Sequence, residues 1–108
     1  MLHKIAKGRE GADMAKIEQI ILILMAVMFA FNGLYMLVDP IGWYETIPGV
    51  TRTGPPNPHF IRDIGLMYAT SAGLLGYALI KPETKRLMVG IAAIWITGHG
   101  LFHVWEWL

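Results

Sequence analysis

The stretch Thr97–Leu108 carries the residues best suited to chemistry. His99, His103 and Glu106 recur there within an otherwise apolar run. At about 100° per residue, the three positions fall on one stripe of an α-helix. Two imidazoles four residues apart, followed by a carboxylate three residues later, can point at one metal ion, as in metal sites built on helices. The stripe therefore predicts a site for Zn, Fe or Cu, or for haem through one or two axial imidazoles.

A second pair of candidate ligands lies earlier in the chain. His59 and Asp63 are four residues apart, so they share one face of a helix. Cysteine is absent, which leaves histidine, carboxylate and methionine as candidate ligands. The seven methionines are scattered and are better explained as packing in an apolar core. If the two stripes face each other, His59 or Asp63 would complete the site.

The same residues also fit a structural role. Arg62 would pair with Asp63 or Glu106, and the imidazoles would bond backbone carbonyls and interfacial water. We call this arrangement the polar clasp; it also includes Asp39 and Asn57. A proton relay through the histidines and Glu106 is a further alternative.

The composition of the chain indicates the environment of these residues and excludes several classes of function. Hydrophobic residues make up 55% of the 108-residue chain, more than a soluble domain of this size can bury. Charged residues make up 16% and the formal net charge is +1, so nucleic acid is not an expected partner. The motifs of a nucleophile elbow, a phosphate loop and a dinucleotide site are absent. We expect a non-catalytic, all-α protein that forms one integral membrane domain over residues 1–108.

Three apolar runs predict transmembrane helices at about 20–38, 60–80 and 87–107. The nineteen residues of the first run nearly span a hydrocarbon core of about 30 Å. Asp39-Pro40 ends this helix because proline disfavours helix at the residue before it. The second helix begins near Pro58, with Asn57 as its N-cap.

The segments between the runs are predicted to be less regular. Residues 1–19 are expected to form a short, partly helical cytoplasmic interfacial arm or a frayed tail, because Gly8 and Gly11 interrupt any early helix. Residues 39–58 form a loop with turns, because they are rich in proline and glycine. In the first helix, Asn32 is expected to form a hydrogen bond across a helix interface.

Small residues predict close helix packing along two of the spans. They recur as Gly65, Ala69 and Gly73 in the second, and as Gly90, Ala93 and Thr97 in the third.

The positive charges predict the direction in which the chain crosses the membrane. Four Lys or Arg residues precede the first span, two lie in or just after the long loop, three lie near the turn at 81–86, and none follows. The positive-inside rule places the N-terminus and this turn in the cytoplasm, and loop 39–58 and the C-terminus outside. All the candidate polar residues then gather at the outer leaflet.

One stretch resembles a known family. Residues 53–65 read T-G-P-P-N-P-H-F-I-R-D-I-G, and the last helix carries H-x-x-x-H-x-x-E at His99, His103 and Glu106. These features resemble a family of small, uncharacterised bacterial inner-membrane proteins. The resemblance covers about residues 30–107 and implies a multi-pass protein of the bacterial inner membrane with a shared polar cluster. Members usually continue into a fourth helix, whereas this sequence ends at Leu108.

Three functional hypotheses follow. In the first, the chain is an accessory subunit packed against a larger membrane complex. A chain of this size with one polar cluster has little room for a substrate cavity of its own. In the second, it binds a divalent metal or haem through His99 and His103. In the third, a homo-oligomer forms a small transporter or proton channel.

Overall fold

The computed structural model describes all residues 1–108 and contains helices without strands. The elements are α1 (Leu2–Val38), α2 (Pro40–Thr46), the 3₁₀ turn η1 (Val50–Thr53), α3 (Pro58–Ile80), the 3₁₀ turn η2 (Pro82–Thr84) and α4 (Lys85–Trp107). Helix α1, helix α3 and the segment Pro82–Trp107 are each long and apolar enough to cross a membrane. The predicted all-α class and the number of candidate spans are therefore confirmed. The direction of crossing stays a prediction.

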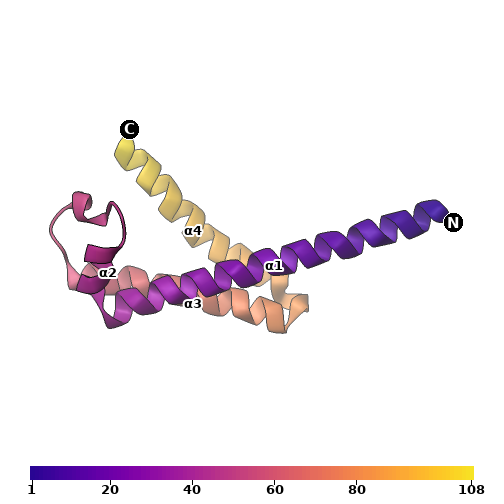
Figure 1. Ribbon diagram of the computed structural model, residues 1–108, viewed down its shortest axis with the longest axis horizontal. Helices are drawn as coiled ribbons and strands as arrows, with labels where there is room; N and C mark the ends of the chain where they lie inside the picture. Colours follow the sequence, from indigo (N-terminus) through magenta and orange to yellow (C-terminus); the bar gives the residue numbers. More distant parts are fainter.

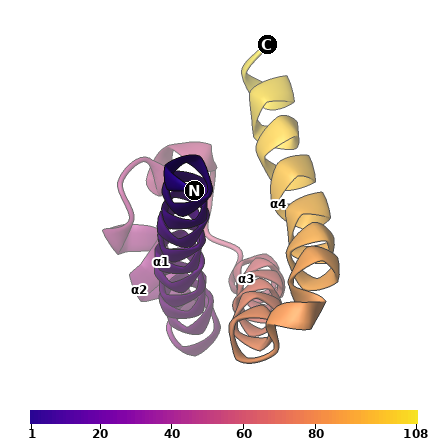
Figure 2. The same ribbon diagram turned by 90° about the vertical axis from the view of Figure 1, so that its right-hand side faces the viewer.

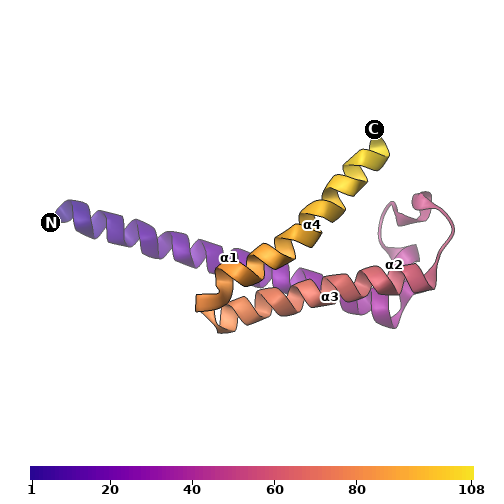
Figure 3. The same ribbon diagram turned by 180° about the vertical axis from the view of Figure 1, so that it is seen from behind.

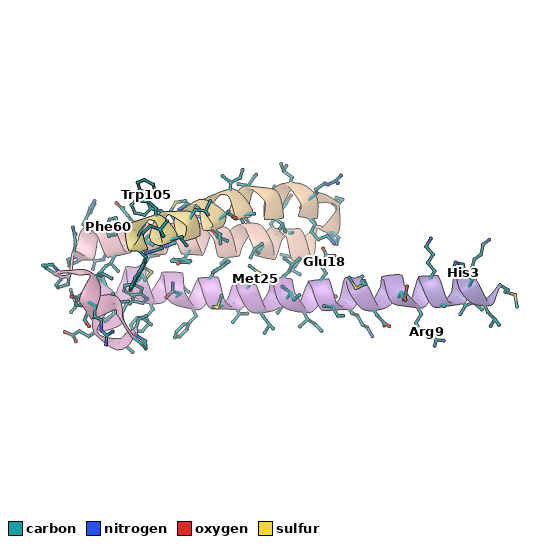
Figure 4. The ribbon with its side chains drawn as sticks, turned by 90° about the horizontal axis from the view of Figure 1, so that it is seen from above. His3, Arg9, Glu18, Met25, Phe60 and Trp105 are labelled. Carbon is teal, nitrogen blue, oxygen red and sulfur yellow. The ribbon has the colours of Figure 1, made fainter.

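Helix α1 is longer than the sequence predicted. It begins at Leu2, so the arm at residues 1–19 continues the same helix, and Gly8 and Gly11 do not interrupt it. Glycine costs only about 1 kcal/mol relative to alanine within a helix, and strong helix formers such as lysine, glutamate, alanine and methionine surround both positions. The arm extends beyond every other element, as the labelled His3 and Arg9 show in Figure 4.

The segment after α1 is also more regular than the loop expected at 39–58. Asp39 ends α1, and its Oδ1 accepts a 3.0 Å hydrogen bond from the backbone N–H of Gly42. Pro40 then occupies the first turn of α2, where its fixed φ and missing N–H suit the start of a helix. The hydroxyl of Tyr44 donates to the carbonyl oxygen of Gly54 at 2.5 Å. These bonds order most of the segment.

Helices α1 and α3 form the main interface and run side by side in opposite directions (Figure 3). Leu22, Phe29 and Met36 of α1 are buried, as are Ile61 and Leu75 of α3. Apolar side chains from both helices therefore form most of the core.

Helix α4 joins this core only through its first half. The central cluster contains Leu22, Phe29, Leu75 and Ala92, so all three long helices contribute to it. Ala92 is the one fully buried residue of α4, and every residue from Gly100 to Leu108 is exposed. Figures 1 and 2 show α4 diverging from α3 toward the C-terminus, on the side of α3 away from α1.

The two predicted small-residue faces differ in burial. Gly65 is buried and Ala69 half-buried against α1, whereas Gly73 is exposed. Gly90, Ala93 and Thr97 are also exposed, because the face of α4 that contains Ala92 is the one that meets α3. Close packing of small residues within this chain is thus limited to α1 and α3.

Candidate functional site: an imidazole pair on α4

The structure brings the two histidines of α4 into direct contact. The Nε2 atoms of His99 and His103 lie 3.2 Å apart, within hydrogen-bond distance. The two rings meet edge to face, with their centroids 4.6 Å apart. Glu106 continues the stripe, because its Oε2 lies 3.8 Å from Nδ1 of His103. The three residues therefore form one continuous polar row, as their helical spacing predicts.

Aromatic rings support this row from the core side. Trp95 stacks on His99, with ring centroids 4.9 Å apart and an interplanar angle of 15°. Tyr68 of α3 meets Trp95 edge to face at 5.0 Å, and Phe29 of α1 lies 5.7 Å from Tyr68. These contacts fix the ring of His99 more firmly than that of His103. The spacing of Trp95 four residues before His99 indicates the stacking of these two rings. No local pattern in the sequence links Tyr68 or Phe29 to the row.

The row is more exposed beyond His99 than at His99 itself. His99 is half-buried, whereas the side chains of His103 and Glu106 are 54% and 52% exposed. At about 1.5 Å per residue, His99 lies about 21 Å along α4 from Lys85. That distance is shorter than a hydrocarbon core of about 30 Å. His99 would therefore lie inside the apolar layer if α4 crosses a membrane.

The other candidate ligands do not reach this row. His59 and Asp63 contact each other, with 3.5 Å between Nε2 and Oδ2, and their side chains are 89% and 64% exposed. No group of three or more His, Asp and Glu side chains lies close enough to hold one metal ion. The reason is the divergence of α4 from α3, which separates the end of α4 from the beginning of α3 (Figure 1).

The residues of the predicted polar clasp act separately. Arg62 pairs with neither Asp63 nor Glu106; its Nε donates to the carbonyl oxygen of Leu37 at 3.2 Å. That carbonyl lies in the last turn of α1, where carbonyls lack partners within the helix. Asn57 caps α3, as predicted, by accepting from the backbone N–H of Phe60 at 3.1 Å. Asp39 instead caps α2.

Asn32 forms a side-chain hydrogen bond within the same chain. Its Oδ1 accepts a 2.8 Å hydrogen bond from Nε1 of Trp43, and both residues are half-buried. Helix α2 thus turns the indole of Trp43 back onto α1.

The spacing of the two α4 imidazoles suits metal coordination. Zinc binds imidazole nitrogen at about 2.0–2.1 Å in tetrahedral geometry, so two such ligands lie about 3.3 Å apart. The 3.2 Å between the Nε2 atoms is close to this distance. His99 and His103 can therefore supply two of four zinc ligands, while Glu106 lies beside the second.

Comparison with known proteins identifies a family. A family model described as a domain of unknown function, DUF4345, matches residues 17–107. The chain belongs to this family. The match includes the three candidate spans apart from the first part of α1. It contains both the His99 and His103 pair and the His59 and Asp63 pair. No curated protein and no solved structure matches the chain.

Proposed function

We propose that this chain is a non-catalytic subunit of a larger membrane assembly and that the stripe of His99, His103 and Glu106 on α4 contacts the neighbouring protein. The proposal places it in a bacterial inner membrane, with its N-terminus and the turn before α4 in the cytoplasm. The positive-inside pattern and the sequence resemblance at residues 53–65 support this placement.

One observation carries the proposal. The second half of α4 leaves the core although it holds the most polar row of the third span, and all residues from Gly100 onward are exposed. Imidazole and carboxylate groups that face lipid are costly, so such residues usually meet protein or water. A neighbouring membrane protein that covers this row would remove the cost and fix the position of α4.

The test is the mass of the assembly released from native membranes in mild detergent. The expected result is a complex heavier than one chain, which the double substitution His99→Leu and His103→Leu dissociates. Thr97→Leu is the matched control, because Thr97 is exposed on the opposite face of α4. A free monomer, or equal dissociation by both variants, would contradict the proposal.

A second candidate function is the binding of a divalent metal or haem, and the 3.2 Å spacing of the Nε2 atoms favours it. Metal analysis and an absorption spectrum of tag-free protein test this candidate. Bound zinc, copper or iron that is lost in His103→Ala but kept in His59→Ala would support it. A Soret band would indicate haem, whereas the absence of both metal and Soret band would exclude the candidate.

A further inference from the structure

We infer that a second copy of this chain covers the histidine stripe of α4, and that the two copies together complete a binding site for a divalent transition metal such as Zn²⁺. The four ligands would be His99 and His103 from each copy. The inference rests on the second candidate function and names the partner that the site requires.

A single chain supplies only half of such a site. Its two imidazole nitrogens have the spacing of two tetrahedral ligands, yet no third His, Asp or Glu side chain lies close enough to share one ion with both. Structural zinc sites take four protein ligands. The missing ligands must therefore come from another molecule that brings the same chemistry to the same depth of the membrane.

A second copy meets this condition by symmetry. Two copies inserted in the same direction can be related by a two-fold axis along the membrane normal, so each residue meets its equivalent at equal depth. The row is self-complementary, because imidazole both donates and accepts hydrogen bonds and Glu106 accepts them. Trp95 already holds the ring of His99, which lowers the cost of ordering the site.

The second half of α4 offers an exposed surface to a second copy. The chain exposes 8241 Å², whereas a compact water-soluble monomer of 12.1 kDa exposes about 6,000 Å². Part of the excess belongs to the projecting arm of α1, and part to the second half of α4. The half-helix beyond His99 includes Phe102, Trp105 and Trp107, which are 58%, 74% and 88% exposed.

Cysteine cross-linking tests the geometry, because the chain has no native cysteine. Phe102→Cys and Leu101→Cys form a matched pair, with native side chains 58% and 64% exposed at adjacent positions. Phe102 lies about 60° around the helix from His99, whereas Leu101 lies about 160° away. In vesicles of bacterial phospholipids, a short bismaleimide should link two copies of Phe102→Cys, with and without added Zn²⁺. It should leave Leu101→Cys largely monomeric.

Zinc binding tests the chemistry. Tag-free protein stripped with a chelator and titrated with Zn²⁺ alone should bind one ion per two chains. His99→Ala and His103→Ala should each weaken binding at least tenfold, and His59→Ala should leave it unchanged. Circular dichroism of each variant would verify that the helices remain folded.

The outcomes separate this inference from the proposed functions. A stoichiometry of one zinc ion per chain, without cross-linking of Phe102→Cys, would contradict a second copy at the site. It would still support metal binding by the single chain. No zinc binding, together with a complex containing a different protein, would overturn the composite site but keep the accessory subunit. Equal cross-linking of both cysteine variants would also overturn the inference, because it indicates unspecific collisions.

Discussion

Gly33 of α1 lies directly against Gly65 of α3. A Cβ atom on Gly33 would stand 2.7 Å from the carbonyl oxygen of Gly65 and 2.7 Å from the backbone nitrogen of Ala69. A Cβ atom on Gly65 would stand 2.7 Å from Cβ of Met36. Two helix backbones can approach this closely only where neither residue has a side chain, as at small-residue crossings of membrane helices.

The first prediction concerns this crossing. Gly33→Ala should lower the free energy of unfolding by about 1–3 kcal/mol, because the added methyl group meets backbone atoms that cannot move alone. Reversible unfolding in mixed micelles, followed by circular dichroism, would measure the change. Gly73→Ala is the control, since no atom lies within 4 Å of a Cβ there. Equal destabilisation by both variants would show that the crossing is not the cause.

The second prediction concerns the hydrogen bond from Trp43 to Asn32. Trp43→Phe should destabilise the protein by about 0.5–2 kcal/mol, because it leaves the half-buried amide of Asn32 without its donor. A double-mutant cycle with Asn32→Leu would isolate the interaction, and the two changes together should cost less than the sum of their separate effects. Strict additivity would argue against the bond.

The third prediction concerns the N-cap of α3. Asn57→Ala should cost about 1 kcal/mol, because it removes the acceptor for the backbone N–H of Phe60. Asn57→Asp should retain most of the stability, since a carboxylate caps equally well. Chemical unfolding of the two variants beside the original protein would reveal the difference. A stable Asn57→Ala variant would mean that Pro58 alone is enough to start the helix.

The fourth prediction concerns the ion pair between Glu18 and Lys85. Nζ of Lys85 lies 2.6 Å from Oε1 of Glu18, and both side chains are about half exposed. Glu18 projects from α1 toward the start of α4 in Figure 4. Because solvent screens such pairs, Lys85→Glu should cost less than about 1 kcal/mol. Adding Glu18→Lys should restore most of the loss in an unfolding measurement at low salt, and the effect should shrink at high salt.

Local patterns in the sequence were enough to predict most of the helical elements. The apolar runs, the Asp39-Pro40 break, the turn at 81–86 and the Asn57 cap act over a few residues, so the sequence determined the three long helices and the start of α3. The same local rules placed His99, His103 and Glu106 on one stripe. They were insufficient for residues 1–19, where helix formers outweigh Gly8 and Gly11, and for α2.

Only the tertiary structure decided which stripes meet. Whether His59 and Asp63 could join the histidines of α4 depends on the angle between α3 and α4, and that angle follows from packing around Ala92 and Leu75 rather than from any local pattern. The same packing placed Tyr68 of α3 against Trp95 and left Gly90 exposed. The sequence by itself determined the imidazole pair, because i,i+4 spacing is a property of one helix. The divergence of α4, a property of three helices together, decided that His59 and Asp63 do not join this pair.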